Sequence, residues 1–312
     1  MIPFEYRTPK NLKEVHASLK EFGTDAKLIA GGTALVIMMK QRLVRPTCLV
    51  SLRSVRGLNS IELKDGGLRI GGLATHREVE NSSLVRRRLP LLAETYHHVA
   101  TIRVRNMATV GGGLAHADPN QDPPPALIAL GATVKATSPN GSRVIPLDAF
   151  FTDYYETVLN PDEIITDVFV PKLAANTGAA YLKFLPRTAD DYATVSAAAV
   201  LTLDKNRKII NDVRIALGSV GTTPIRATAA EAVLRGQPLK TEAFAEAAEK
   251  AKEAVDPVSD FRGSAAYKKE MAGVFVRRAL EKALANLRQQ QKAAPRAVKR
   301  TVKKTVKKRR KR

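Results

Sequence analysis

The sequence predicts an α+β protein of two domains, and three observations support this prediction. A short apolar strand at 27–30 ends in a glycine pair and leads directly into a helix-forming segment. A central stretch, residues 102–122, carries three consecutive glycines. Between 178 and 218, β-rich alternating segments precede alanine-, lysine- and glutamate-rich segments that are typical of helices. The first two features indicate one domain and the third a second, smaller domain.

Length and composition fit this division. At 312 residues, of which 44% are hydrophobic, the chain can form two domains with substantial cores. We expect the first domain at 1–175, in two lobes of about 1–55 and 56–175, and the second domain at 176–287. The remaining residues, 288–312, are a Lys- and Arg-rich tail that we expect to be disordered.

The first lobe is predicted to contain a β-α-β unit. Apolar residues at helical spacing indicate an opening helix between 6 and 22. Asn11 and Gly23 are placed to cap its two ends. The strand at 27–30, the helix after the glycine pair and a strand at 47–52 then follow in order.

The second lobe is predicted to be richer in strands. One long helix is expected at 79–99, and a short helix is expected after Asp122, because the prolines that follow are preorganised for a first helical turn. Short strands are expected at 60–63, 68–72, 74–76, 132–136, 143–146 and 163–171.

The second domain is predicted to be a three-stranded antiparallel sheet covered by helices. The strands are expected at 178–187, 193–203 and 209–218, where apolar and β-rich residues alternate. The helices are expected at 228–235, 241–254 and 265–287.

Both glycine segments have the chemistry of an anion site. Glycine lacks Cβ and accepts φ > 0, so Gly31-Gly32 and Gly111 to Gly113 can bring bare main chain close to a ligand. Main-chain N–H groups in such turns form concave anion sites, and two turns suit a pyrophosphate. Asp118 and Asp122 can accept hydrogens from ligand hydroxyls. The combination indicates a nucleotide, although a glycine run is also typical of a mobile turn and Asp122 could serve only to cap the next helix.

Several common classes of function are excluded. No Gly-Lys-Ser/Thr ending and no G-x-G-x-x-G spacing is present, which excludes P-loop and nicotinamide-type Rossmann motifs. No H-E-x-x-H or Ser/His/Asp signature is present, and His97, His98 and His116 have no further ligand at metal-binding spacing. Cys48 is the only cysteine, so this chain alone has neither an internal disulfide nor a thiolate-held iron–sulfur cluster. No apolar run reaches about 18 residues and no signal peptide is recognisable, so we expect a cytoplasmic protein.

The net charge of +21 is concentrated at the C-terminus. From Lys292 to Arg312, twelve Lys and Arg residues occur without an acidic residue, and the net charge falls from +21 to +9 once these twelve are removed. Such a run of like charges is typical of an interaction tail. A polyanion such as nucleic acid, an acidic partner subunit and an anionic membrane surface are all possible partners, and a merely solvated extension is the alternative.

Five motifs together resemble the flavin-binding medium subunit of molybdenum-containing hydroxylases, the family of xanthine dehydrogenase and aerobic carbon monoxide dehydrogenase. The resemblance extends from residue 1 to about 287 and is greatest for the carbon monoxide dehydrogenase medium subunits. The motifs are I-A-G-G-T-A-L at 29–35, I-R-V-R-N-M-A-T-V-G-G at 102–112, D-P-N-Q-D at 118–122, R-T-A-D-D-Y-A-T-V at 187–195 and S-D-F-R-G-S-A-A-Y-K-K-E-M-A-G-V at 259–274.

The resemblance implies a two-lobed FAD-binding domain of the PCMH type, followed by the smaller α+β domain. Residues 27–35 and 109–113 would hold the pyrophosphate from two sides, and Asp122 would bind ribose or ribityl hydroxyls. Tyr192 would stand near the reactive face of the flavin and is the one catalytic candidate. The implied FAD-binding residues are Lys27, Leu28, Ile29, Ala30, Gly31, Gly32, Thr33, Ala34, Leu35, Ile102, Thr109, Val110, Gly111, Gly112, Gly113, Asp118, Asp122, Ile165, Lys183 and Tyr192.

The resemblance also implies a place in a larger enzyme. The chain would be an FAD-dependent oxidoreductase subunit that takes electrons from a [2Fe-2S] small subunit and passes them to an external acceptor. Molybdopterin and the clusters are expected only on partner subunits, a molybdenum-binding large subunit and the small subunit, in a dimer of heterotrimers. Carbon monoxide, a purine, an aldehyde or an aromatic compound could be the substrate, because the substrate pocket belongs to another polypeptide.

This sequence departs from the family pattern at three positions. Gly113 stands where many relatives have asparagine, Thr33 where many have histidine or another polar residue, and Ala34 where many have serine. These differences bear on the affinity for FAD. Because Thr33 is not histidine, FAD is expected to be bound non-covalently.

Two other functions remain open from the sequence. A self-contained flavin oxidase of the vanillyl-alcohol-oxidase type would need a sizeable substrate domain, whereas only about 110 residues separate the flavin-binding part from the tail. A nucleic-acid-binding protein that acts through the tail would carry no flavin, and the two glycine segments argue against it as the primary role.

Overall fold

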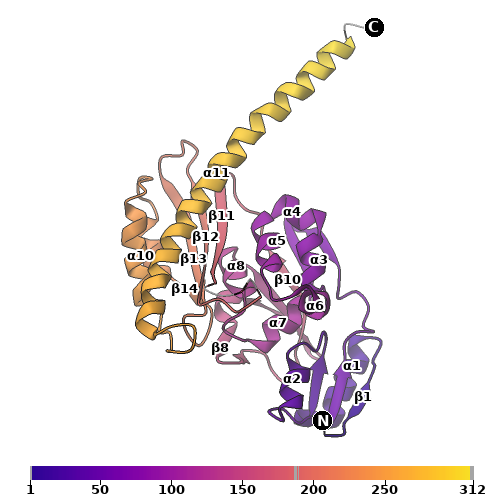
Figure 1. Cartoon of the computed structure of the whole chain (residues 1–312). Coiled ribbons are helices and arrows are strands. Elements are labelled where there is room, and N and C mark those ends of the chain that lie inside the picture. Colours follow the sequence, from indigo (N-terminus) through magenta and orange to yellow (C-terminus); the bar gives the residue numbers. More distant parts are fainter. Residues whose placement is uncertain (1, 186–187, 189, 310–312) are drawn as a thin grey trace.

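The structure is a computed structural model that describes residues 2–185, 188 and 190–309, with side chains described as far as Lys292. Figure 1 shows an N-terminal lobe, a central lobe and a C-terminal sheet with its helices, and helix α11 projects from the last of these. Arg187 and Ala189, which belong to one of the five motifs, lie outside the described residues.

The N-terminal lobe contains a parallel three-stranded sheet, one strand more than predicted. Strands β2 (Ala26–Ile29) and β3 (Cys48–Ser51) confirm the predicted pair, and β1 (Glu5–Arg7) adds to them in the order β1-β3-β2. A strand of three residues is too short to show an alternating pattern. Helices α1 (Leu12–Phe22) and α2 (Leu35–Lys40) complete the lobe.

Helix α1 begins and ends at the predicted caps. The Asn11 side chain accepts a hydrogen bond from the main-chain N–H of Glu14 at 3.0 Å. Gly23 ends the helix with φ of 55°, a left-handed value that favours glycine. A short 3-10 turn at Gly23–Asp25 then leads into β2.

The central lobe is built on an antiparallel five-stranded sheet in the order β4-β5-β10-β6-β7. Its large buried core lies between this sheet and the helices of the lobe, and it continues into the C-terminal sheet at Tyr181, Ala198, Val200 and Ala216. The predicted strand at 74–76 is wrong, because Thr75 forms only a single bridge to Thr109 and His76 begins a helix. The strands are β4 (Ile61–Lys64), β5 (Gly67–Gly71), β6 (Thr133–Ser138), β7 (Gly141–Pro146) and β10 (Ile164–Val170), with a 3-10 turn (Leu147–Ala149) and a separate pair, β8 (Phe151–Asp153) and β9 (Glu156–Thr157).

The single helix predicted at 79–99 is three helices in the structure. Ser82 caps the second helix through a hydrogen bond from the N–H of Val85 at 3.3 Å, and Pro90 occupies the first turn of the third. Proline lacks the N–H needed inside a helix, so the chain turns there instead of continuing. The helices of this lobe are α3 (His76–Asn81), α4 (Ser83–Arg88), α5 (Pro90–His97), α6 (Ile102–Met107), α7 (Val110–His116) and α8 (Pro123–Ala129).

The C-terminal domain has a four-stranded antiparallel sheet, which corrects the predicted three strands. The order is β11-β12-β13-β14, and the extra strand has only two residues, too few to leave a periodic signal. Helices pack on this sheet around a second core. The elements are β11 (Thr177–Phe184), β12 (Val195–Leu203), β13 (Ile210–Gly218), β14 (Ile225–Arg226), α9 (Thr228–Leu234), α10 (Ala243–Glu253) and α11 (Ala265–Arg309).

Helix α11 differs in length from the prediction. Its first part packs on β11 and β12, and a Cβ added at Gly178 would lie 2.1 Å from the carbonyl oxygen of Ala283. The helix then continues to Arg309, through residues for which the sequence predicts disorder. The packed part supplies the helix nucleus, and alanine, glutamine, lysine and arginine extend a helix readily, whereas Pro295 lacks the N–H for one hydrogen bond of this helix. Among the described residues, no helix has the length and apolar character needed to cross a membrane.

Candidate functional site

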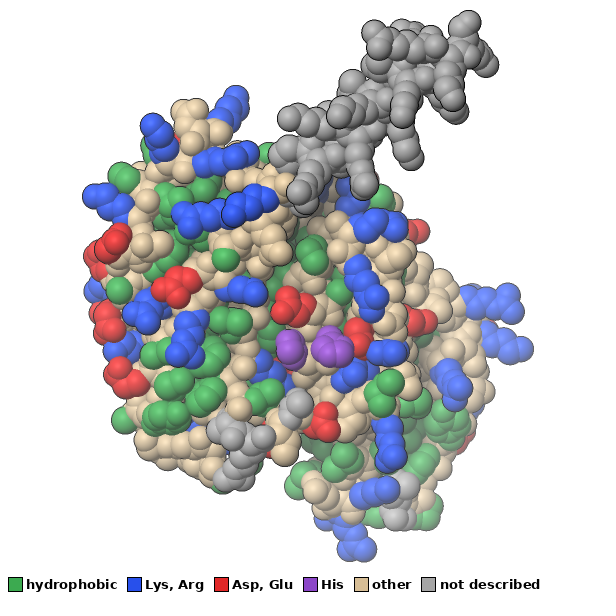
Figure 2. All heavy atoms as spheres, turned by 45° about the horizontal axis from the view of Figure 1, so that its top comes forward, with side chains coloured by type: hydrophobic (Ala, Val, Ile, Leu, Met, Phe, Trp, Pro, Cys, Tyr) green, Lys and Arg blue, Asp and Glu red, His purple; other side chains and the backbone are tan. Residues whose placement is uncertain are grey.

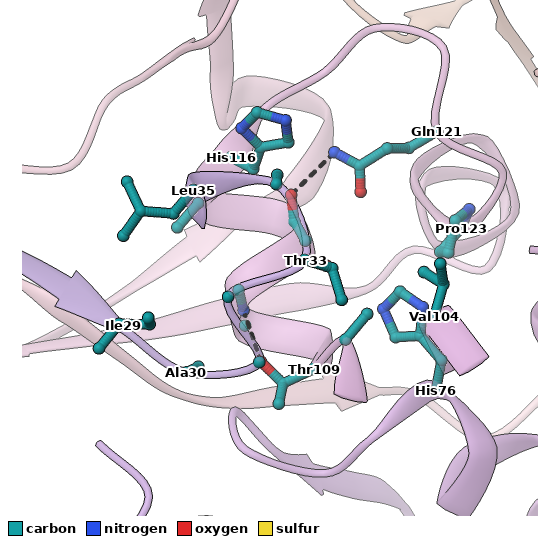
Figure 3. A pocket seen from close by; sticks show the side chains of 18 of the residues that line it. Ile29, Ala30, Thr33, Leu35, His76, Val104, Thr109, His116, Gln121 and Pro123 are labelled. Carbon is teal, nitrogen blue, oxygen red and sulfur yellow. Dashed lines mark hydrogen bonds between the residues drawn. The ribbon is translucent and has the colours of Figure 1, made fainter. Parts of the chain in front are cut away.

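A cleft of about 680 Å³ opens where the three parts of the molecule meet. This volume lies within the range of about 300–1,000 Å³ found for ligand sites. The loop at 30–34 lines one side, the start of α7 another, and Lys183 and Tyr192 of the C-terminal domain a third. Figure 3 shows the loop that carries Ala30 and Thr33 crossing close to Thr109.

The loop between β2 and α2 offers a row of free hydrogen-bond donors. Within the described part of the chain, the main-chain N–H groups of residues 30–34 donate to no other protein group. All five residues are partly accessible, and Gly32 has φ of 71°. Consecutive N–H groups of this kind form a concave site for an anion.

Gly31 lets this loop approach the central lobe very closely. A Cβ placed on Gly31 would lie 1.9 Å from the carbonyl oxygen of Met107, which no side chain could occupy. Met107 ends α6, and the next turn leads into α7. The two glycine segments are therefore neighbours, and Gly31 is required by main-chain packing.

The glycine run at 111–113 corrects the sequence interpretation. These residues lie in the first turn of α7 and have no positive φ. The N–H of Gly111 donates to Gly72 O at 2.8 Å, and that of Gly112 donates to Thr109 Oγ1 at 3.1 Å. The N–H groups of Val110 and Gly113 are also bonded, to Ala74 O and Thr109 O. This segment therefore has no spare main-chain donors in its first turn.

Close packing explains the three glycines instead. A Cβ on Gly111 would lie 2.9 Å from Gly72 O, and one on Gly112 would lie 2.7 Å from Thr109 Oγ1. A Cβ on Gly113 would lie 2.9 Å from Gln121 Oε1. The glycine run thus lets the start of helix α7 pack on Gly72, just after strand β5, and line the cleft without intervening side chains.

Thr109 is the N-cap of α7 and faces the cleft. Its hydroxyl oxygen accepts from the N–H of Gly112, as the dashed line in Figure 3 shows. A hydroxyl can accept and donate at the same time. Thr109 therefore retains one O–H that can be donated to a ligand oxygen.

A buried ion pair forms the third side of the cleft. Lys183 Nζ lies 2.9 Å from Asp122 Oδ2, and the two side chains are only 2% and 4% exposed. Tyr181 donates its hydroxyl to Asp122 Oδ1 at 2.6 Å, and Lys183 also donates to His98 O at 2.9 Å. Burial raises the pKa of the Asp122 carboxyl, whereas Lys183 and Tyr181 act in the opposite direction. Asp122 occupies the N-cap position of α8, but its side chain makes no capping hydrogen bond.

Tyr192 closes the cleft from the C-terminal domain. Its hydroxyl donates to Asp118 Oδ2 at 2.8 Å, and the guanidinium of Arg262 lies 5.6 Å from its ring centre. Partial burial, followed by the Asp118 charge, raises the pKa of Tyr192 well above its ordinary value. The tyrosine is therefore protonated at neutral pH, and its hydroxyl is committed to Asp118.

The carboxylates of the two aspartates thus accept hydrogen bonds from other side chains of the protein. Sequence reasoning treats Asp118 and Asp122 as acceptors for ligand hydroxyls, but Asp122 receives hydrogens from Tyr181 and Lys183, and Asp118 from Tyr192. Asp118 also accepts from the N–H of Asn120 at 2.9 Å and does not line the cleft. Both carboxylates join the central lobe to the C-terminal domain.

Most of the predicted residues line the cleft, and three do not. Ile102, Val110 and Asp118 lie outside its lining. No cluster of three or more His, Cys, Asp or Glu side chains able to hold a metal occurs among the residues that the structure describes. The predicted residues that line the cleft are Lys27, Leu28, Ile29, Ala30, Gly31, Gly32, Thr33, Ala34, Leu35, Thr109, Gly111, Gly112, Gly113, Asp122, Ile165, Lys183 and Tyr192.

His76 and Gln121 are among the cleft residues that sequence reasoning does not predict. His76 is buried beneath Gly113, and burial lowers the pKa of its imidazole to about 4. The Thr75 and Glu78 capping box at the start of α3 is a sequence signal that could have placed His76 on a helix. Gln121 donates its amide to Gly113 O at 2.9 Å, and no local pattern indicates this contact (Figure 3).

Arg105 holds the segment that precedes the cleft. It is 8% exposed and donates to Glu80 Oε2 at 3.0 Å. It also donates to the carbonyl oxygens of Val99 and Ala100, both of which line the cleft. Arg105 belongs to the motif at 102–112, but the motif alone indicates no role for this side chain.

Two family models match this chain. The model described as "FAD binding domain in molybdopterin dehydrogenase" matches residues 2–173, and that described as "CO dehydrogenase flavoprotein C-terminal domain" matches residues 180–283. Together they cover both domains up to the last part of α11.

Characterised relatives agree with these models. The carbon monoxide dehydrogenase medium chain of Hydrogenophaga pseudoflava is 39% identical over 287 residues, which are 91% of this chain and 99% of the relative. The solved carbon monoxide dehydrogenase from the same organism superposes with a TM-score of 0.88 at 41% identity and covers 92% of this chain and 99% of its own. Quinoline 2-oxidoreductase from Pseudomonas putida 86 superposes with a TM-score of 0.85 at 35% identity and covers 91% and 98%.

Proposed function

This chain belongs to the family of FAD-binding medium subunits of molybdopterin-dependent dehydrogenases, and on that premise we propose that its cleft binds FAD non-covalently for electron transfer within a multi-subunit enzyme. Bound FAD supplies the redox chemistry through its ring. The chain itself has to bind, orient and shield that ring. The observation that supports this proposal best is the row of free N–H groups at 30–34 in the cleft.

The residues of the cleft fit a dinucleotide with a central diphosphate. The N–H groups of residues 30–34 would donate to phosphate oxygens, and the remaining O–H of Thr109 would donate from the opposite side. Ile165, which is only 7% exposed and lines the cleft, offers an apolar surface to a flat ring. Lys183 would lie beside the ring as a buried cation, with its charge balanced by Asp122.

We propose that electrons reach this chain from a [2Fe-2S] subunit and leave for an external acceptor. The single cysteine, Cys48, is buried in β3 and cannot by itself hold a cluster of the kind that needs several thiolates. The relatives are named as medium chains or parts of carbon monoxide dehydrogenases, one of them described as a Cu,Mo enzyme. A molybdenum-binding large subunit and a small iron–sulfur subunit, arranged as a dimer of heterotrimers, are the partners we propose.

The choice of substrate would then lie with the large subunit. Relatives named for carbon monoxide and for quinoline share this fold over more than nine-tenths of the chain. A subunit that is shared by enzymes of such different substrates is expected to serve a common step, which is electron transfer.

Titration of the purified chain with FAD tests this proposal. We expect one FAD per chain, with quenching of flavin fluorescence. At an FAD concentration one hundred times Kd, binding would stabilise the fold by about 2.7 kcal/mol, which is measurable as a rise in Tm. Absence of both retention and stabilisation would overturn the proposal. Bleaching of the flavin by an alcohol or phenol without partner subunits would instead support a self-contained oxidase.

A further inference from the structure

The C-terminal tail, which we define as residues 292–312, lies outside the residues that the two family models match. The second family model ends at residue 283. The Hydrogenophaga medium chain is covered to 99% of its own length, yet it covers only 91% of this chain. The tail therefore lies outside the part of the chain that the second family model matches, and the proposed flavin chemistry does not need it.

The tail is uniformly cationic. It contains twelve Lys and Arg residues and no Asp or Glu, and it supplies twelve of the net charge of +21. In the folded body, by contrast, Lys and Arg side chains pair with carboxylates, as Arg226 does with Asp148 and Glu231. A cationic segment without internal counter-charges attracts external anions, and it binds a polyanion most strongly because counterions are then released.

We propose that the tail binds nucleic acid through the phosphate backbone, without sequence specificity. As part of α11, with a rise of 1.5 Å per residue, residues 292–309 extend over roughly 27 Å and carry nine Lys and Arg residues, one per roughly 3 Å. Duplex DNA carries one negative charge per about 1.7 Å of its axis. The two linear charge densities are of the same order, so the tail can match a duplex along its whole length.

The composition of the tail disfavours a membrane surface. Helices that lie in the lipid interface bury Trp, Phe or Leu on one face. The tail contains no aromatic residue and no Leu, Ile or Met, and its largest apolar residues are Val298, Val302 and Val306. Electrostatic attraction to phosphate is the only strong interaction that the sequence of the tail provides.

The position of the tail leaves room for a long polyanion. Figure 1 shows the end of α11 extending away from both domains, on the side opposite the N-terminal lobe. Figure 2 shows Lys and Arg side chains distributed over the visible face of the body. A duplex bound there would leave the cleft accessible, so nucleic-acid binding and flavin binding would be compatible.

Like charges at helical spacing destabilise a helix, and neutralisation by phosphate removes this penalty. Lys303 and Lys307, as well as Lys304 and Lys308, stand four residues apart. Binding should therefore stabilise the C-terminal end of α11 against thermal unfolding. This consequence gives the experiment a spectroscopic readout, the circular dichroism at 222 nm.

The test uses the FAD-loaded full chain and a fluorescein-labelled duplex of about 30 base pairs, with anisotropy as the measure of binding. We expect binding at 50 mM KCl and an affinity at least about a thousandfold lower at 200 mM KCl, as for six or more phosphate contacts. A variant with all twelve Lys and Arg residues of the tail replaced by Gln should lose this binding. A matched variant with only the tail lysines replaced by Arg should retain it.

Flavin absorbance in both variants should equal that of the parent chain, which separates this proposal from the flavin proposal. The inference is overturned if the parent chain fails to bind the duplex at 50 mM KCl, or if the Gln variant binds as well as the parent. Tighter binding to poly-glutamate or to vesicles containing 30% phosphatidylglycerol than to the duplex would also overturn it, in favour of an acidic protein or a membrane.

Discussion

The two sides of the cleft are lined by different kinds of chemical group. The N-terminal side consists of main chain, with free N–H groups at 30–34 and glycines packed on carbonyl groups. The C-terminal side consists of long polar side chains, Lys183 and Tyr192, each bonded to an aspartate of the central lobe. The first side tolerates many side chains but no extra Cβ at Gly31, whereas the second depends on the identity of each side chain.

This difference separates binding from domain attachment. The main-chain side can hold a diphosphate without placing a charge in the cleft, since its donors are neutral N–H groups. The polar side joins two domains, because Asp122 and Asp118 accept from residues 59, 61 and 74 positions away. We therefore expect substitutions on the polar side to affect folding first, and substitutions on the main-chain side to affect ligand affinity first.

The largest expected effect comes from Lys183→Met. This change leaves the buried Asp122 carboxylate without its cation, and breaking such a pair costs about 3–5 kcal/mol of unfolding free energy. Chemical denaturation without added FAD measures this loss. Lys135→Met is the matched control, because Lys135 is exposed on β6, and it should change stability by less than about 0.5 kcal/mol. A loss below about 1 kcal/mol for Lys183→Met would show that the domains are joined by other contacts.

The next largest expected effect is a loss of folding stability at low pH, which is caused by His76. Its pKa falls from 6.5 to about 4 in the folded chain, so the unfolded chain binds more protons between these values. Stability contributed by the neutral imidazole is complete above pH 6.5 and is lost as pH falls toward 4. The expected loss is up to about 3 kcal/mol at 1.36 kcal/mol per pH unit. Denaturation of the parent and of His76→Gln between pH 4 and 7 measures it, and parallel curves for the two proteins would contradict it.

Gly31→Ala is expected to have a smaller effect on stability but a clear effect on binding. The added Cβ would overlap the Met107 carbonyl group, and such overpacking costs about 1–3 kcal/mol. Displacement of the loop at 30–34 should weaken FAD binding by at least about tenfold, at 1.4 kcal/mol per tenfold. Isothermal titration calorimetry measures the FAD affinity of the parent chain, of Gly31→Ala and of a control variant, Gly113→Ala. The methyl group of Gly113→Ala meets the movable end of Gln121, and this variant should bind FAD within about threefold of the parent. Equal affinities for all three proteins would remove the distinction between the two sides of the cleft.

The smallest expected effect is that of Tyr192→Phe. It removes one hydrogen bond to Asp118 from a residue that is 44% exposed, for which we expect a loss of about 1 kcal/mol. Tyr6→Phe, on an exposed tyrosine, is the control. If Tyr192 also stands beside the flavin, the absorption maximum of bound FAD should shift in Tyr192→Phe and not in the control. An unchanged spectrum would confine Tyr192 to the domain contact.

Local signals predicted most of the fold and one side of the site. The Gly31-Gly32 loop follows a strand and precedes a helix, so its position could be inferred from the chain order alone. The predicted turn at 111–113 is wrong, because these glycines lie in a helix and Gly111 packs on Gly72, which is distant in the sequence. The Thr109 cap was the local signal for a helix there.

The polar side of the cleft could not be predicted in the same way. The partners of Asp118 and Asp122 come from strands and loops of the other domain, and nothing in D-P-N-Q-D specifies them. The two-residue strand β14 cannot be predicted from the sequence for a related reason, since its pairing with β13 is set by tertiary packing. Residues whose roles depend on distant contacts require the folded structure.

Amide hydrogen exchange with and without FAD tests the central claim most directly. The N–H groups of residues 30–34 donate to no protein group within the described part of the chain, so they should exchange rapidly in the free protein and slowly once FAD is bound. Peptides that cover the start of α7 should change less, because its N–H groups are already bonded. Stoichiometric FAD binding without protection of residues 30–34 would contradict the account.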